Sequence, residues 1–119
     1  MQSYKDLLVW QKGVQLVSEI YSLTEKFPKN EIFGLTSQMR RAAVSIPANL
    51  AEGYARKHRS EYVQFVRIAF GSGAELETHL HIAQNLGFIS KENGVKADTL
   101  LNEIMRMLNK LSSSLVAKP

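Results

Sequence analysis

Apolar residues recur at helical spacing in four stretches of the chain, and no stretch shows the two-residue alternation of a β-strand. The connections between these stretches are short. Amphipathic helices joined by short connections favour an arrangement in which each helix packs antiparallel to the next. The sequence therefore predicts an all-α fold, an antiparallel up-and-down four-helix bundle with helices at about residues 6–26, 35–55, 60–86 and 91–115.

Residues that start and stop helices mark the ends of these stretches. Pro28 pushes the residue before it out of the α region, so it ends the first helix. Ser60 is expected to cap the N-terminus of the third helix, and Ser90 that of the fourth. Gly87 supplies a C-terminal signal for the third helix.

The length of 119 residues is that of one domain, so we expect a single bundle domain over residues 1–119. The chain has no cysteine, which excludes disulfides, thiolate metal sites and a cysteine nucleophile and suits a reducing compartment. No stretch approaches the roughly 20 apolar residues that cross a bilayer, and the N-terminal residues lack the pattern of a secretion signal. We therefore expect a cytoplasmic protein.

The net charge of +4 is concentrated in one part of the chain. Acidic and basic residues balance in residues 1–37 and again in residues 68–119. The excess lies in residues 38–67, where six arginines and lysines face only Glu52 and Glu61. A local excess of this kind attracts polyanions.

The second helical stretch has small or apolar residues on two faces. One face contains Met39, Ile46 and Leu50, and a second contains Val44, Pro47, Ala51 and Ala55 beside Arg40. A helix of this kind is usually buried on more than one side. In so small a bundle a second copy most economically covers the extra face, so we expect a homo-oligomer. Pro47 removes one backbone hydrogen bond, at a cost of up to about 3 kcal/mol that packing must offset.

The third stretch contains the residues that would first suggest a metal site. Glu75 and His79 share one face of the helix, and Glu77 and His81 share another. Di-iron bundles need Glu-x-x-His on two helices, and this spacing does not occur here. No G-x-S-x-G or P-loop motif occurs either. We expect no metal, no cofactor, no catalytic residue and no enzymatic activity. Within this stretch, Gly71 and Gly73 keep the apolar period in phase, which predicts one long helix with a close-approach notch.

Glu52 lies on the same helical face as Arg41, with small residues between them. A carboxylate among such residues is costly to bury without a partner. We therefore expect a structural ion pair between Glu52 and an arginine, either Arg41 of the same chain or an arginine across a subunit interface.

The basic run between the second and third stretches is the leading candidate for a binding site. Its guanidinium and ammonium groups can bind phosphates, and Tyr54 and Tyr62 can stack on an unpaired base. The alternative is a solvated corner between two helices. The candidate nucleic-acid-binding residues are Arg56, Lys57, His58, Arg59 and Arg67, with Arg40 and Arg41.

Four segments of the chain carry a resemblance to a known family. They are DLLVWQK at residues 6–12, GLTSQMRRAAVSIPANLAEG at residues 34–53, GS at residues 71–72 and ELET at residues 75–78. In these segments the chain resembles the family of the protein encoded within intervening sequences of bacterial 23S ribosomal RNA genes. The resemblance implies an antiparallel four-helix bundle that assembles into a homopentameric ring with a basic surface, and no enzymatic activity. The chain is also similar to the accessory subunits of diversity-generating retroelements, which bind a reverse transcriptase and nucleic acid.

Two functions of different classes remain open at this point. One is an oligomeric module that binds structured RNA, ribosomal or related, through the basic residues. The other is a homo-oligomeric scaffold that recruits a protein partner such as a reverse transcriptase.

Overall fold

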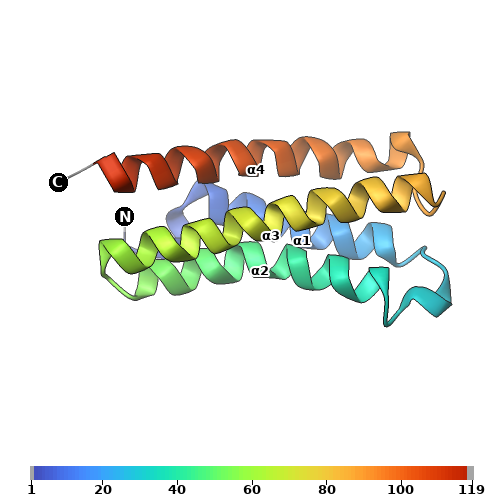
Figure 1. The fold of residues 1–119 in the computed structure, drawn as a ribbon, viewed down its shortest axis with the longest axis horizontal. Helices are drawn as coiled ribbons and strands as arrows, with labels where there is room; N and C mark the ends of the chain where they lie inside the picture. Colours follow the sequence, from blue (N-terminus) through green and yellow to red (C-terminus); the bar gives the residue numbers. More distant parts are fainter. Residues whose placement is uncertain (1, 118–119) are drawn as a thin grey trace.

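The computed structural model describes residues 2–117 and confirms the four-helix bundle (Figure 1). The helices are α1 (Leu8–Thr24), α2 (Leu35–Ala55), α3 (Arg59–Asn85) and α4 (Lys91–Ala117), with two short 3₁₀ helices, η1 (Tyr4–Asp6) and η2 (Lys29–Glu31). Each helix packs against two others, α1 and α3 both against α2 and α4, so the four axes lie at the corners of a square. The described residues form no strand, and none of their helices is both long and apolar enough to cross a bilayer.

The four helices bury one continuous core between them. The side chains at its centre are fully buried and come from every helix, for example Leu16, Ile20, Met39, Ile46, Leu50, Leu76, Leu80, Leu101, Ile104 and Leu108. They recur at three- and four-residue intervals, the spacing from which the helices were predicted.

Close approaches between helices occur where the sequence supplies glycine. Gly13 of α1 lies against Pro47, whose buried ring sits inside a continuous α2. A Cβ atom on Gly73 would meet the sulfur of Met105 in α4, whereas one on Gly71 would meet nothing within 4 Å. The prediction of one long third helix with a notch is confirmed, and the notch is at Gly73.

The first and third helices begin differently from the prediction. Ser3 and Asp6 form a capping box around η1, and Leu7 is extended (φ −71°, ψ 122°), so α1 starts only at Leu8. The prediction that Ser60 caps α3 is wrong, because α3 already begins at Arg59. The residue before it, His58, is extended and makes no side-chain cap bond.

The connection between α3 and α4 matches its prediction. Gly87 has a φ of +78°, and the N–H groups of Gly87 and Phe88 donate to the carbonyls of Gln84 and Ala83, which is a Schellman motif. The Ser90 hydroxyl then accepts the N–H of Asn93 at 3.0 Å, so Ser90 caps α4 as predicted. The helix continues through Ala117, two residues further than predicted.

Candidate nucleic-acid interface

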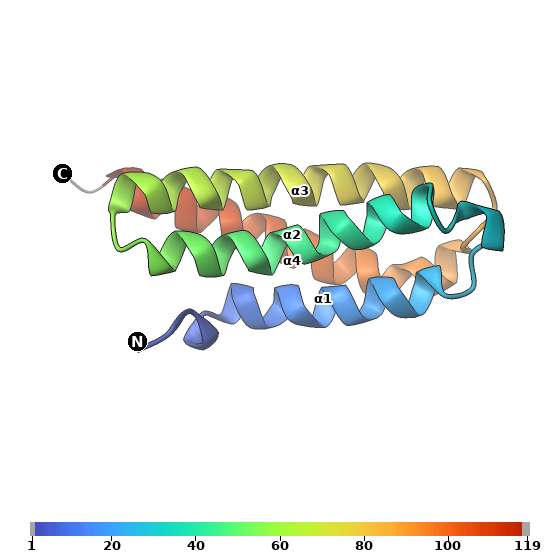
Figure 2. The same cartoon turned by 90° about the horizontal axis from the view of Figure 1, so that it is seen from below.

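The basic run lies in the tight connection between α2 and α3, at the end of the bundle that also holds both chain termini (Figures 1 and 2). We call residues 52–62 the hairpin tip. Arg56 is the C-cap residue that follows α2, Lys57 adopts the left-handed conformation (φ 62°), and Arg59 is the first residue of α3. The chain therefore reverses direction within three residues. All four residues of the run, from Arg56 to Arg59, are exposed.

Arg56 is bound to two acidic residues of the same tip. Its Nη2 donates to Glu52 Oε2 at 2.9 Å, and its Nη1 donates to Glu61 Oε2 at 3.2 Å. These hydrogen bonds raise the pKa of Arg56 above its usual value, the contact with Glu52 contributing most. The guanidinium carbon also lies 5.0 Å from the ring centroid of Phe65. Arg56 thus joins α2 to α3, and its charge is already neutralised within the chain.

The ion pair that Glu52 forms within the chain is therefore with Arg56, and not with Arg41 as predicted. The side chain of Glu52 is 53% exposed, so the chain does not bury this carboxylate. Glu52 pairs with Arg56 because residues four apart in a helix lie on the same side, one turn from each other, and this spacing favours ion pairs. A contact between Glu52 and an arginine of a second copy stays a prediction.

Next to the exposed cations, two tyrosines form the walls of a hollow. The rings of Tyr54 and Tyr62 are perpendicular, with centroids 5.9 Å apart. Burial raises the pKa of Tyr62, and the neighbouring Tyr54 raises it further. The hollow has a volume of about 380 Å³, and we call it the tip hollow; its lining residues are Gln2, Gly53, Tyr54, Lys57, His58, Arg59, Tyr62 and Leu115.

The tip hollow includes residues that the sequence did not connect with it. Gln2 and Leu115 are distant in sequence from the basic run. Both lie there because an up-and-down bundle brings the start of its first helix and the end of its last helix to the same end as the α2–α3 connection (Figure 2). The sequence predicted this up-and-down topology, and the topology alone would have placed Gln2 and Leu115 near the basic run.

The other predicted arginines of α2 lie at the far end of that helix. The Nε of Arg40 donates to Thr24 Oγ1 at 2.9 Å, and its guanidinium carbon lies 4.5 Å from the ring centroid of Tyr21. Arg40 is thus held against α1. Arg41 is exposed, fifteen residues before Arg56, which corresponds to about 22 Å along the helix axis.

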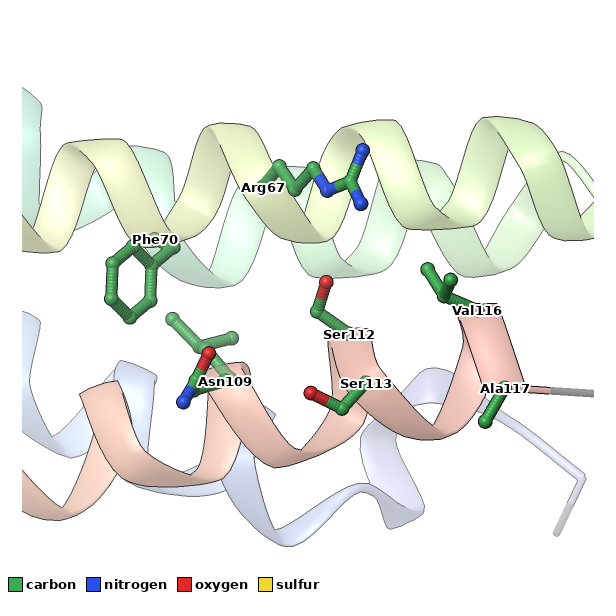
Figure 3. A pocket seen from close by; sticks show the side chains of 8 residues that line it. Arg67, Phe70, Asn109, Ser112, Ser113, Val116 and Ala117 are labelled. Carbon is green, nitrogen blue, oxygen red and sulfur yellow. The ribbon is translucent and has the colours of Figure 1, made fainter.

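Arg67 faces a different pair of helices. It lines a hollow of about 520 Å³ between α3 and the C-terminal part of α4, together with Phe70, Ser112 and Val116. Figure 3 shows Phe70 directed toward α4 and the Ser112 hydroxyl directed toward α3. The seven predicted residues therefore do not form one surface in a single chain. Only Lys57, His58 and Arg59 share the tip hollow.

The histidines and glutamates of α3 do not form a metal site. His79 is buried, and its Nε2 lies 3.7 Å from Glu75 Oε2, while its Nδ1 has no hydrogen-bond partner among the described residues. His81 is exposed. Residues 2–117 contain no group of three or more histidine, aspartate or glutamate side chains that could hold a metal ion.

Comparison with known proteins gives a family for this arrangement. The family model described as 23S rRNA-intervening sequence protein matches residues 5–110, which include α1, α2, α3 and α4 as far as Lys110. The chain belongs to this family. The match ends seven residues before the described end of α4, so the hairpin tip lies well within the part that members of the family share.

A solved structure shares the fold of this chain. It is the crystal structure of a protein with unknown function from the S23 ribosomal protein family of Bacteroides thetaiotaomicron VPI-5482. The two chains are 21% identical, with a TM-score of 0.79, and the alignment covers 88% of this chain and 98% of the other. At this identity the likeness establishes the bundle fold alone. No curated protein matches the chain.

Proposed function

We propose that this protein is a non-enzymatic, oligomeric nucleic-acid-binding module that binds structured RNA, ribosomal or related. The observation that carries the proposal is the tip hollow, where Lys57 and Arg59 adjoin two tyrosine rings. Cations of this kind bind phosphates, and aromatic rings stack on bases that are not paired. The family name, which refers to 23S rRNA, supports ribosomal RNA as the first target to test.

One hairpin tip carries too little charge for strong binding by itself. Its three arginine and lysine side chains face Glu52 and Glu61, which leaves one net positive charge. Each phosphate contact adds a limited amount to affinity, and the contribution falls as salt rises. Several copies held in one assembly would present several tips to the same RNA and multiply their effect.

The apolar residues left exposed support such an assembly. Tyr21, Ile32 and Val44 line a hollow along α1, α2 and the connection between them, which we call the α1–α2 seam. Phe70 and Val116 are exposed in the hollow between α3 and α4, which we call the α3–α4 seam. The two seams lie on opposite sides of the square of helices. One seam of each copy against the other seam of the next would give a ring, as in the pentamer that the sequence resemblance implies.

RNA binding across a salt series tests the proposal. We expect the purified protein to bind a structured ribosomal RNA fragment more tightly than a matched DNA duplex. The slope of log affinity against log salt should be several units, since each neutralised phosphate contributes roughly 0.7 to 0.9. No binding at low salt would overturn the proposal.

A pair of variants locates the binding surface. Lys57→Gln combined with Arg59→Gln should weaken RNA binding and flatten the salt slope. The control is Lys26→Gln combined with Lys29→Gln, which removes the same charge at the opposite end of the bundle and should have little effect. Equal losses in the two double variants would show that only the overall charge matters.

The small net charge of the tip favours the second function, a homo-oligomeric scaffold that recruits a protein partner such as a reverse transcriptase. In that case a stoichiometric protein partner would stay bound through nuclease treatment and high salt. The charge variants at the tip would then leave partner binding unchanged.

A further inference from the structure

The charged side chains that line the tip hollow are all basic, whereas the hairpin tip as a whole also contains two carboxylates. Lys57, His58 and Arg59 contribute to its wall, and none of its described lining residues carries a carboxylate. The two acidic residues of the tip, Glu52 and Glu61, are both engaged by Arg56 outside this lining. Arg56 therefore pairs with the two carboxylates outside the hollow. The groups that line the hollow itself are suited to bind an anion.

The aromatic wall of the hollow is fixed in place by the close contact between α2 and α3. A Cβ atom on Gly53 would lie 2.6 Å from Phe65 Cβ and 3.2 Å from Tyr62 Cδ1. The ring of Tyr62 thus packs directly on the α2 backbone at Gly53. The ring of Tyr54, on the same turn of α2, stands at 90° to it. The two rings are held as adjoining perpendicular walls, and a flat ligand can stack on one ring while its edge meets the other.

The left-handed residue in the loop contributes to the same arrangement. Lys57 has a φ of 62°, a conformation that a lysine rarely adopts without constraint. Its side chain makes no hydrogen bond or ion pair with any of residues 2–117, in contrast to that of its neighbour Arg56. Its ammonium group is therefore available to a phosphate at the rim of the hollow.

From this combination we propose that the tip hollow holds one unpaired nucleotide, with its base stacked on the ring of Tyr54 and its phosphate bound by Lys57. The volume of about 380 Å³ lies within the range of small-molecule sites. The inference rests on the proposed function and adds to it the part of the RNA that is recognised. The protein binds a bulged or single-stranded nucleotide in the hollow, and it contacts the adjoining duplex only through phosphates. Such a nucleotide exposes the flat face that a paired base hides.

The test compares two short RNA strands of equal length and charge. One strand is oligoadenylate, and the other has abasic ribose at every position. Stacking of one base on an aromatic side chain is worth enough to make the native protein bind oligoadenylate about 5- to 150-fold more tightly than the abasic strand. Equal affinity for the two strands, with a normal salt slope, would overturn the nucleotide site and leave the RNA-binding proposal standing. No binding of either strand or of structured RNA at low salt would overturn both.

Variants connect the preference to the hollow. Tyr54→Leu should remove the preference for oligoadenylate and leave binding of the abasic strand unchanged. Tyr62→Phe keeps the ring and loses only the hydroxyl, so it should retain the preference. This mild substitution is used because a larger change at Tyr62 could misfold the protein. Phe33→Leu alters an aromatic side chain that is 94% exposed at the opposite end of the bundle, so it should behave as the native protein. A preference that survives Tyr54→Leu undiminished would contradict the site.

Discussion

The guanidinium of Arg56 lies 2.9 Å from the carboxylate of Glu52, one turn earlier in α2, and it reaches Glu61 of α3 at 3.2 Å as well. Arg56 is the first residue of the basic run and would be the first choice for a phosphate contact on sequence alone. The structure gives it a different role, because each of its two terminal nitrogens donates to a carboxylate. In the proposed RNA-binding function, the contribution of Arg56 would be to pair with these two carboxylates and offset one of their two negative charges.

Removal of the two carboxylates should therefore strengthen RNA binding. In the double variant Glu52→Gln and Glu61→Gln, Arg56 becomes free to bind a phosphate. We expect a higher affinity at low salt and a salt slope steeper by about 0.7 to 0.9, the contribution of one phosphate. The measurement is RNA binding across a salt series.

The matched control changes the same number of acidic residues elsewhere. Glu25→Gln with Glu92→Gln alters the net charge equally at the opposite end of the bundle. If this control steepens the salt slope as much as the tip variant, the effect belongs to the net charge of the protein and Arg56 has no special position.

The sequence predicted the helices well because each one leaves a periodic apolar pattern. It predicted the binding residues less well, since nearness along a helix is not nearness on a surface. Arg40 and Arg41 are adjacent in sequence, but a rotation of 100° per residue directs Arg40 toward α1 and leaves Arg41 exposed. The contact between Arg56 and Glu61 depends on the left-handed conformation of Lys57, where the chain reverses direction. The sequence pattern did not predict this conformation. The pair of Glu52 with Arg56 was visible as an i,i+4 spacing.

Gly53 should be sensitive to the smallest possible substitution. Alanine normally stabilises a helix by about 1 kcal/mol relative to glycine. At position 53, however, the new Cβ would lie 2.6 Å from Phe65 Cβ, so the helices must separate. We expect Gly53→Ala to lower the free energy of unfolding by about 1 to 3 kcal/mol, the usual cost of overpacking, as measured by urea denaturation.

Gly71→Ala is the control for Gly53→Ala. Both glycines lie inside helices, but a Cβ on Gly71 would meet nothing within 4 Å. This substitution should raise the free energy of unfolding by about 0.5 to 1 kcal/mol. A change of the same sign in the two variants would contradict the close contact at Gly53.

The half-buried Tyr62 should ionise at a higher pH than the ordinary tyrosine value of 10.0. Burial, and then the charge of a neighbouring Tyr54 tyrosinate, raise its pKa above the ordinary value of 10.0. A group with a raised pKa in the fold contributes stability that is fully present below the unfolded pKa. That contribution is lost as the pH rises through the folded pKa, so the protein should become less stable above about pH 10.

Tyrosinate absorbance during an alkaline titration measures this effect. A late step, above the ordinary tyrosine value of 10.0, should appear in this titration, and Tyr62→Phe should remove it. The same variant should flatten the dependence of stability on pH in this range. A late step that persists in Tyr62→Phe would assign the raised pKa to another residue.

The two exposed seams predict how an assembly can be broken and partly rebuilt. If the α1–α2 seam of one copy contacts the α3–α4 seam of the next, an aspartate in either seam disrupts every interface of the ring. Val44→Asp and Val116→Asp are suitable because both side chains are exposed in the chain and their replacement leaves the core intact.

Each variant alone should be a folded monomer by light scattering. Each also keeps one intact seam, so an equal mixture of the two should form dimers and no larger ring. A dimer formed by either variant alone would indicate that its intact seam contacts the same seam of another copy in a symmetric interface. Native protein that is itself a monomer would contradict the assembly.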